Sequence, residues 1–265
     1  NLSCAFCPGT RRPASFLSPE DFHTLAAGLR PHTQYLYLHL MGEPLLHPWL
    51  DAVLSQAEEL GFHVMLTTNG TLLGQRQNLL LSRPAVKKVS VSLHSFEGSQ
   101  REWLTDYLTE CLSFAKAAGE AGKKCALRLW NLGEAHGYNR LNGDILAALE
   151  KAFSPPWTEG RRGTTLAPNI FLEWGERFDW PDLSARDGQA PTFCYGLRDQ
   201  VGVLVDGTVV PCCLDHEGDI PLGNLFQNSL EDILDSPRAR AIHDGFSQGQ
   251  AREPLCRKCG FARRF

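Results

Sequence analysis

The chain has 265 residues, of which 43% are hydrophobic, and its formal net charge is −4. This length suffices for one large domain, or for a medium domain and a small one. The sequence pI of about 6.1 argues against a dedicated nucleic-acid binder. No apolar run of the sequence approaches the roughly 20 residues of a membrane span. We therefore expect a globular cytoplasmic protein with neither nucleic acid nor membrane as a partner.

Predicted strands and helices alternate between residues 35 and 176. The predicted strands are residues 35–42, 62–70, 86–95, 124–132 and 169–176. The predicted helices are residues 47–61, a polar segment before the third strand, 107–122 and 142–153. A loop with Pro155, Pro156 and Gly160 precedes the last strand. This alternation predicts an α/β fold with parallel strands and right-handed crossovers, arranged as a doubly wound sheet or as a barrel-like sheet of the TIM type.

Polar and glycine-rich residues collect where each of these strands ends. They are Met41 to Pro44, Thr67 to Gly70, then Ser92, His94 and Ser95, then Arg128 and Asn131, and finally Glu173 and Trp174. In a β/α barrel the strand ends converge on the face that carries functional sites. No GxGxxG motif follows the first strand, so the sequence does not support a dinucleotide-binding sheet. The strand ends therefore favour a barrel.

The last seventy residues predict a smaller domain. Two β-branched runs flank Asp206-Gly207, which is a strong signal for a hairpin turn. A turn and a helix follow between residues 222 and 246. We expect residues 1–185 to form the barrel domain and residues 186–265 to form the second domain.

Nine cysteines occur in the chain, and this odd number cannot pair fully within one molecule. Cys4 and Cys7 form one CxxC pair, and the other lies near the end of the chain, in LCRKCGF. Two such pairs in a chain of cytosolic character indicate metal or redox chemistry rather than a disulfide scaffold. Cys111 and Cys125 each lie alone in an apolar stretch and are interpreted as buried thiols.

The opening stretch NLSCAFC resembles the end of the CxxxCxxC loop of radical S-adenosylmethionine enzymes. In that family three cysteines hold a 4Fe–4S cluster, and the fourth iron binds S-adenosylmethionine (AdoMet). The resemblance implies that Cys4 and Cys7 are the second and third of these cysteines. It also implies that the chain lacks the first cysteine, immediately before Asn1, and the first barrel strand. The expected fold is thus a partial (β/α)6 TIM-like barrel lacking its first strand.

HLMGEP resembles the GGEP stretch of the same family, with Met41 in place of the first glycine. The resemblance implies that the backbone around Gly42 and Glu43, which Pro44 follows, meets the amino group of AdoMet. Soft thiolates suit the iron–sulfur cluster beside it.

Other cofactor contacts are implied by position along the barrel. Phe6 occupies the place of an aromatic residue that packs near adenine. Ser92 matches a common contact to the polar groups of AdoMet, and Arg128 resembles the residue that often pairs with its carboxylate. Asn69 and Asn131, at the ends of the second and fourth strands, complete the expected cofactor-binding set.

The step from Gly207 to Cys212, the GNL stretch and the closing CxxC are similar to the SPASM/Twitch extension of this family. The extension implies an auxiliary 4Fe–4S cluster, and the cysteine count allows one, as in the shorter Twitch form. Its expected ligands are Cys194, Cys212, Cys256 and Cys259. Neighbouring residues of an extended strand point to opposite faces, so Cys212 and Cys213 are not both expected to ligate one cluster. The Gly-x4-Cys spacing favours Cys212.

The resemblance implies a radical AdoMet oxidoreductase or maturase. Such an enzyme reductively cleaves AdoMet to a 5′-deoxyadenosyl radical, which abstracts hydrogen from a small-molecule or peptide substrate. It needs a reducing electron donor such as flavodoxin or ferredoxin. Two alternatives are an iron–sulfur electron-transfer or scaffold protein without radical chemistry, and a structural zinc protein, although compact zinc modules have tighter cysteine spacing.

Overall fold

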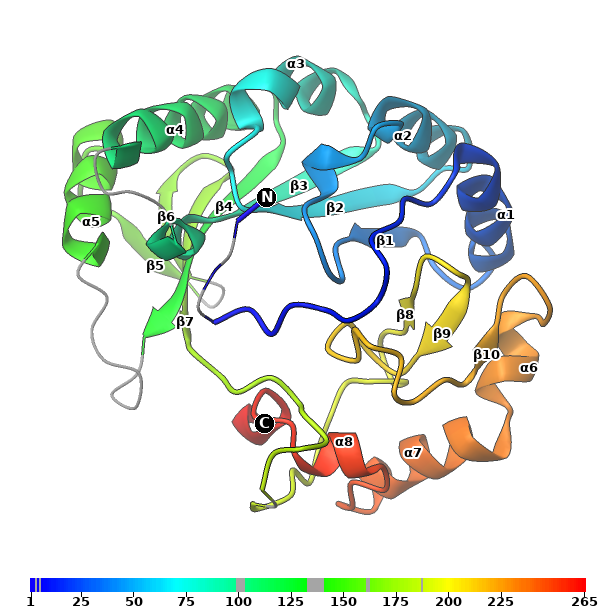
Figure 1. The fold of residues 1–265 in the computed structure, drawn as a ribbon. Coiled ribbons are helices and arrows are strands. Elements are labelled where there is room, and N and C mark those ends of the chain that lie inside the picture. Colours follow the sequence, from blue (N-terminus) through cyan, green and yellow to red (C-terminus); the bar gives the residue numbers. More distant parts are fainter. Residues whose placement is uncertain (3, 5, 99–102, 133–140, 161–162, 187) are drawn as a thin grey trace. The chain divides into compact units, whose positions relative to one another are not determined.

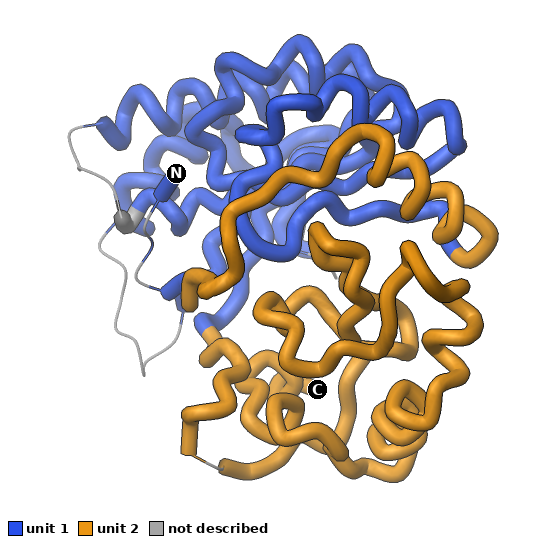
Figure 2. Tube along the Cα trace, turned by 45° about the vertical axis from the view of Figure 1, so that its right-hand side comes forward, with its two compact units in different colours: residues 1–7, 33–177 blue, residues 8–32, 178–265 orange. Residues whose placement is uncertain are grey.

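The computed structural model describes residues 1–2, 4, 6–98, 103–132, 141–160, 163–186 and 188–265. Contacts divide the chain into two compact units (Figure 2). The first unit is residues 1–7 with 33–177, and the second is residues 8–32 with 178–265. The domains predicted from the sequence are continuous segments, and that division stays a prediction. No helix of the described residues is long and apolar enough to cross a membrane.

The first unit is built on a seven-stranded sheet with the order β1-β2-β3-β4-β7-β6-β5. Its strands are β1 Tyr35–Leu38, β2 His63–Thr68, β3 Val86–Ser92, β4 Lys124–Leu132, β5 Thr158–Gly160, β6 Gly163–Ala167 and β7 Ile170–Glu176. β1, β2, β3, β4 and β7 pair in parallel, which confirms the α/β class and the predicted strands. Across the described residues the sheet is open, with β1 and β5 at its edges, and no barrel closes.

The antiparallel hairpin β5–β6 differs from the prediction of a loop before the last strand. Pro155, Pro156 and Gly160 indicated a loop, but Gly160 lies in β5 and pairs with Gly163 of β6. β6 then pairs antiparallel with β7 and buries alternate residues, Thr164 and Leu166. Burial against a strand that follows in the chain thus outweighs the local turn signal.

Helices cover one face of this sheet (Figure 1). They are α2 Leu50–Glu59, α3 Leu73–Ser82, α4 Leu104–Glu120 and α5 Leu141–Ala152, which agree with the predicted helical segments. α2 contacts β2, and α4 contacts β4 and β7. In β2, Val64 and Leu66 are buried, whereas Met65 and Thr67, which point to the opposite face, are half-buried. Cys111 and Cys125 are fully buried, as predicted.

The second unit contains an antiparallel sheet with the order β10-β9-β8. Its elements are α1 Pro19–Leu29, β8 Gly202–Val203, β9 Thr208–Val210, β10 Gly223–Asn224, α6 Leu230–Leu234, α7 Pro237–Ser247 and α8 Pro254–Arg257. β8 and β9 pair across the predicted Asp206-Gly207 turn. The single helix predicted after the turn is two helices, because Ser236 and Pro237 begin a new one. Val209, Ile233 and Ile242 belong to the core of this unit.

Candidate cofactor sites

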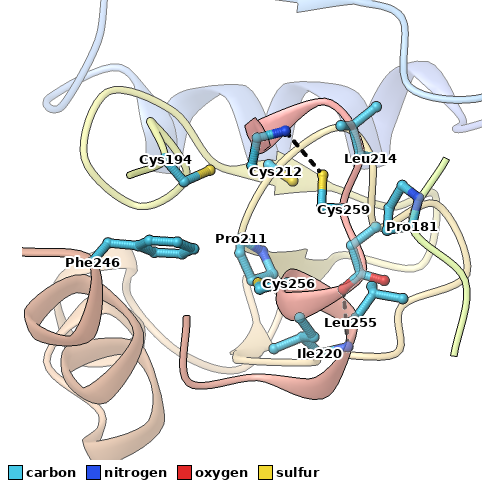
Figure 3. Close-up of a pocket in the computed structure, with 12 residues that line it drawn as sticks. Pro181, Cys194, Pro211, Cys212, Leu214, Ile220, Phe246, Leu255, Cys256 and Cys259 are labelled. Carbon is cyan, nitrogen blue, oxygen red and sulfur yellow. Dashed lines mark hydrogen bonds between the residues drawn. The ribbon is translucent and has the colours of Figure 1, made fainter. Parts of the chain in front are cut away.

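Four cysteines line one cavity of the second unit (Figure 3). They are the predicted auxiliary-cluster ligands Cys194, Cys212, Cys256 and Cys259, and they come from the segment before β8, the end of the hairpin, and α8 with the residues after it. The rest of the lining is mainly apolar, and Cys213 is not part of it. Within the described ranges, no group of three or more His, Cys, Asp or Glu side chains is arranged to hold a metal ion.

The donor set of this cavity fits an iron–sulfur cluster. Thiolates are the ligands that such clusters take, and hydrogen bonds to the sulfurs tune their potential. The backbone N–H of Gly196 donates to Cys194 Sγ at 3.3 Å, and that of Ala262 donates to Cys259 Sγ at 3.4 Å. Cys194 Sγ and Cys259 Sγ thus each accept a hydrogen bond from a backbone N–H, as cluster-ligating sulfurs do.

Burial raises the pKa of all four thiols. The pKa of Cys256 rises to about 12, first through desolvation and then through the neighbouring thiols Cys194 and Cys259. The pKa of Cys212 is raised well above its usual value, first through desolvation and then through the neighbouring thiol of Cys213, with smaller contributions from Cys194 and Cys256. Since the thiolate is the form that ligates metal, the cavity favours ligand thiolates only when a positively charged group offsets this cost.

The N-terminal segment of the first unit lies beside the carboxyl ends of β2 and β3. Asn69 Nδ2, just after β2, donates to Asn1 Oδ1 at 2.8 Å. Cys4 Sγ donates to the backbone oxygen of Ser95 at 3.3 Å, in the 3-10 helix Leu93–Gly98 that follows β3. Cys7 is exposed, and its N–H donates to Cys4 O at 3.1 Å. The structure therefore brings the first CxxC pair to the strand ends that carry the other predicted residues.

Phe6 packs between two side chains of the same unit. Its ring lies 5.0 Å from the ring of His94, and the guanidinium of Arg177 lies 5.7 Å from its centroid. His94 Nδ1 is 3.2 Å from the backbone oxygen of Arg128. Burial, with a smaller contribution from the Arg128 charge, lowers the pKa of His94 to about 4. His94 is therefore a neutral ring at pH 7, and it fixes Phe6 beside β4.

Glu43 joins the end of the first predicted strand to the end of the second. Its Oε1 accepts from Leu45 N at 3.0 Å and from Thr68 Oγ1 at 2.8 Å, and its Oε2 accepts from Asn69 N at 2.8 Å. Gly42, next to it, has a φ of +100°, and no atom lies within 4 Å of the place of a Cβ. The Glu43 carboxylate is thus hydrogen-bonded to other groups of the protein, whereas the space beside the Gly42 backbone is open.

Arg128 is paired with a carboxylate of the protein itself. Its Nε donates to Glu173 Oε2 at 2.9 Å, and Lys88 Nζ donates to Oε1 of the same side chain at 2.6 Å. Arg128 Nη1 also lies 3.4 Å from Thr67 Oγ1, and Ser92 is the register partner of Arg128 on β3. Burial alone would raise the pKa of Glu173, but Arg128 and Lys88 hold it below its usual value. These residues form one charged network on the face opposite the helices.

The described hydrogen bonds of Asn131, another predicted cofactor-binding residue, are made to α5 and not to the network of Arg128, Glu173 and Lys88. Asn131 Nδ2 donates to Asn142 Oδ1 at 2.9 Å, and Asn142 Nδ2 donates back at 3.1 Å. Both side chains are buried. This reciprocal amide pair connects β4 to α5.

His39 is a residue that the sequence reasoning missed. Its Nδ1 is buried and, among the described residues, has no hydrogen-bond partner. Burial and the Arg128 charge lower its pKa to about 4. Tyr35, Tyr37 and His39 alternate along β1 and its end, and the Tyr37 and His39 rings are 5.7 Å apart. This period of two was the signal that could have placed His39 on the same face as Tyr37.

Three kinds of comparison show which known proteins this chain resembles. Residues 194–260 match the SPASM family, described as an iron-sulfur cluster-binding domain. A probable GTP 3′,8-cyclase of Pyrobaculum aerophilum is 28% identical over 108 residues, which are 40% of this chain and 34% of that protein. The match therefore spans about a third of the length of this curated relative.

Three solved structures have a similar fold. BtrN in complex with AdoMet and 2-DOIA is 17% identical, with a TM-score of 0.62 over 98% of this chain and 87% of that one. Streptococcus suis SuiB bound to precursor peptide SuiA is 17% identical, with a TM-score of 0.59 over 99% and 67%. The anSMEcpe protein with AdoMet and Cp18Cys peptide is 13% identical, with a TM-score of 0.65 over 99% and 86%.

The fold of the chain is therefore similar to that of proteins crystallised with AdoMet. The match to the SPASM family at residues 194–260 agrees with the SPASM/Twitch extension recognised from the sequence, and the fold is similar to those of BtrN, SuiB and anSMEcpe. The SPASM family is described as iron-sulfur cluster-binding, and BtrN and anSMEcpe were crystallised with AdoMet, in agreement with the predicted cofactors.

Proposed function

We propose that the chain is a radical AdoMet enzyme whose first unit binds AdoMet and the radical cluster, and whose second unit binds one auxiliary 4Fe–4S cluster. The observation that carries this proposal is the cavity lined by Cys194, Cys212, Cys256 and Cys259 within the SPASM match. When bound and reduced, such a cluster would supply the electron that cleaves AdoMet, and the resulting 5′-deoxyadenosyl radical would take hydrogen from the substrate.

In the first unit, Cys4 and Cys7 are the proposed thiolate ligands. Phe6, fixed by His94, is proposed to pack against adenine. The open backbone at Gly42 leaves room for the amino group of AdoMet. Glu43 and Pro44 shape this turn, since Glu43 caps the 3-10 helix Pro44–Leu46.

The charged network is proposed to receive the carboxylate of AdoMet. Arg128 has five N–H donors, and contacts to Glu173 and Thr67 involve two of its nitrogens. The remaining donors and the hydroxyl of Ser92, on the adjacent strand, can bind polar groups of the cofactor. Glu173 orients the guanidinium and offsets part of its charge. Asn69, held by Glu43, and Asn131 complete the proposed set.

The substrate is proposed to be a small molecule or a peptide. BtrN was crystallised with 2-DOIA, SuiB with its precursor peptide SuiA and anSMEcpe with the Cp18Cys peptide, so both classes occur on this fold. The proposed reaction class is that of an oxidoreductase or maturase, with a flavodoxin or a ferredoxin as the electron donor.

Anaerobic reconstitution tests the proposal. We expect iron and sulfide to bind in equal amounts, and we expect the reduced full gene product to form 5′-deoxyadenosine from AdoMet. Clusters without 5′-deoxyadenosine would favour an electron-transfer or scaffold protein. One zinc per chain without sulfide would favour a structural zinc protein.

A further inference from the structure

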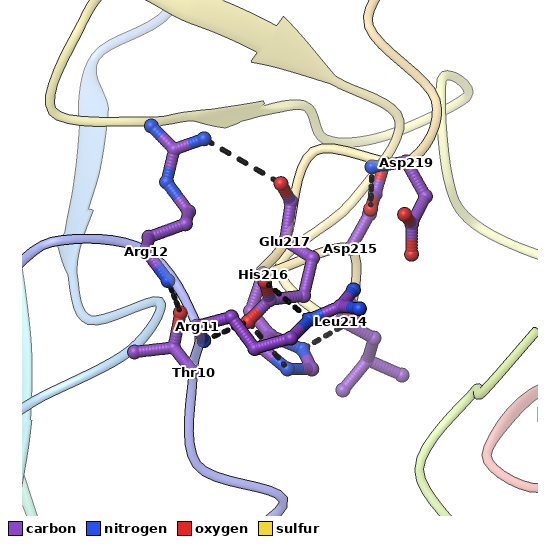
Figure 4. Close-up of polar contacts among 8 residues, drawn as sticks. All are labelled: Thr10, Arg11, Arg12, Leu214, Asp215, His216, Glu217 and Asp219. Carbon is purple, nitrogen blue, oxygen red and sulfur yellow. Dashed lines mark hydrogen bonds and ion pairs between the residues drawn. The ribbon is translucent and has the colours of Figure 1, made fainter.

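The segment that follows Cys7 is attached to the loop that follows Cys212, within the second unit (Figure 4). The backbone N–H of Arg11 donates to Glu217 Oε1 at 2.9 Å, and Arg11 Nε lies 3.4 Å from Oε2. Arg12 Nη2 pairs with Asp206 Oδ2 at 2.6 Å, and Arg12 Nη1 lies 3.5 Å from the backbone oxygen of Glu217. We call these four residues, Arg11, Arg12, Asp206 and Glu217, the clamp.

The clamp combines shielded and exposed groups. The side chain of Glu217 is 14% exposed and that of Arg12 is 27% exposed, whereas Arg11 is 84% exposed. Because exposed ion pairs contribute little, the hydrogen bonds that involve backbone groups, from Arg11 N to Glu217 and from Arg12 to the Glu217 backbone oxygen, are expected to matter most. Asp206 is itself fixed in the hairpin turn, since its Oδ1 accepts from Thr208 N at 3.1 Å.

The loop that carries Glu217 is also a wall of the four-cysteine cavity. Leu214, Asp215 and Ile220 line that cavity. The buried carboxylate of Asp215 accepts from Asp219 N at 2.8 Å and from Ile220 N at 2.9 Å, which closes the loop. The N–H of Asp215 in turn donates to the backbone oxygen of Cys212 at 3.3 Å. The hydrogen bonds of Asp215 therefore connect the two ends of the 212–220 loop, Cys212 and Ile220, and Glu217 on this loop accepts from Arg11.

We propose that the clamp couples occupancy of the auxiliary-cluster site to the ordering of residues 8–18, the chain directly after Cys7. A cluster held by Cys212 fixes the 212–220 loop, the loop fixes Glu217, and Glu217 with Asp206 fixes Arg11 and Arg12. Coupling between two sites is reciprocal, so ordering of residues 8–18 also favours the loaded auxiliary site. Arg12 and Glu217 are therefore positioning residues for residues 8–18, within the second unit. This inference rests on the function proposed for the four cysteines and adds a link between their site and the order of residues 8–18.

Hydrogen–deuterium exchange of peptides covering residues 8–18 tests the coupling. The protein used is the Cys4→Ala/Cys7→Ala variant, in which bound iron reports on the second unit. Loading with iron and sulfide is expected to slow exchange of residues 8–18 by about fivefold or more, the lower range of coupling between sites. Arg12→Ala or Glu217→Ala in the same background should abolish this slowing. Arg240→Ala, which removes an exposed ion pair with Asp235 in the same unit, is the matched control and should retain it.

The charge swap Arg12→Asp with Asp206→Arg provides a second check, and it should restore part of the slowing that Arg12→Ala abolishes. Exchange of β2 peptides reports whether each variant is folded. If the four cysteines take up no iron, the proposed function fails and the coupling with it. If iron is bound and exchange of residues 8–18 does not change, or if Glu217→Ala retains the slowing, the coupling alone is contradicted.

Discussion

The four-cysteine cavity of the second unit and the candidate AdoMet site of the first unit differ in the contacts that their side chains make within the protein. In the second unit, four cysteine side chains face a common apolar cavity, and the contacts to their sulfurs include backbone N–H groups. In the first unit, Glu43 and Arg128 are held by other groups of the protein. A metal cluster needs ligand atoms that stay available to it, whereas a face that binds an organic cofactor gains from charged groups that orient one another.

The largest effect is expected from a substitution that removes one of the four cysteines of the cavity. Cys256→Ala removes one of four ligands, so we expect the chain to lose about four irons if the cluster is of the 4Fe–4S type. Iron and sulfide analysis after anaerobic reconstitution measures this loss. Cys213→Ala, outside the cavity lining, is the matched control and should keep its iron. Equal losses in the two variants would contradict the ligand assignment.

A second substitution tests the packing of Gly70, which follows β2 at the candidate AdoMet site of the first unit. Gly70 has a φ of +87°, and a Cβ there would lie 2.8 Å from Cys111 Sγ and 3.0 Å from Val91 Cγ1. Gly70→Ala should therefore lower the free energy of unfolding by about 3 kcal/mol, through strain and overpacking together. Chemical denaturation measures the change. Gly122→Ala shares the positive φ of +71° but meets open space, so it should cost clearly less; equal costs would show that the contacts behind Gly70 do not matter.

Glu43→Gln tests whether the first site depends on preorganised charge. The amide cannot accept from Thr68, Leu45 and Asn69 as the carboxylate does, so we expect a loss of about 2 kcal/mol in stability. Displacement of Asn69 should also weaken AdoMet binding about tenfold, which corresponds to 1.4 kcal/mol. Equilibrium binding of AdoMet to the reconstituted full gene product measures this. Glu59→Gln, on the exposed surface of α2, is the control; unchanged AdoMet affinity in Glu43→Gln would contradict the role of this turn.

A pH dependence of similar size is expected from His94. His94 has a pKa of about 4 in the fold and 6.5 in a model peptide, so the unfolded chain binds the proton more readily. Stability is therefore lost as the pH falls from about 6.5 towards 4, and His94 accounts for about 2 kcal/mol of this loss at pH 5. Urea denaturation of the cluster-free protein should show a smaller loss between pH 7 and 5 in His94→Gln. Parallel pH profiles for the two proteins would contradict the burial of a neutral His94.

Local patterns predicted much of the fold. Short β-type runs that alternate with helical segments predicted five parallel strands and the helices α2 to α5. The helix α1 was missed, although Ser18 before Pro19 is a helix start signal and the Ser18 side chain accepts from Asp21 N. The β5–β6 hairpin was missed because it depends on pairing with β7, which the local sequence of the hairpin does not indicate.

The sites were predictable to the extent that motifs are local. Spacing and family resemblance chose Cys194, Cys212, Cys256 and Cys259, and these cysteines share a cavity. The pairing of Arg128 with Glu173 joins strands whose register only the folded sheet defines. The contact of Arg12 with Asp206 likewise joins residues 194 positions apart, and no sequence pattern indicates it.

Iron and sulfide analysis with electron paramagnetic resonance of the reduced Cys4→Ala/Cys7→Ala variant tests the central claim most directly. We predict about four irons and four sulfides per chain, with a signal of one reduced 4Fe–4S cluster, because the four cysteines of the second unit remain. A variant that holds no iron or sulfide would contradict the account, and so would one that holds a single zinc ion.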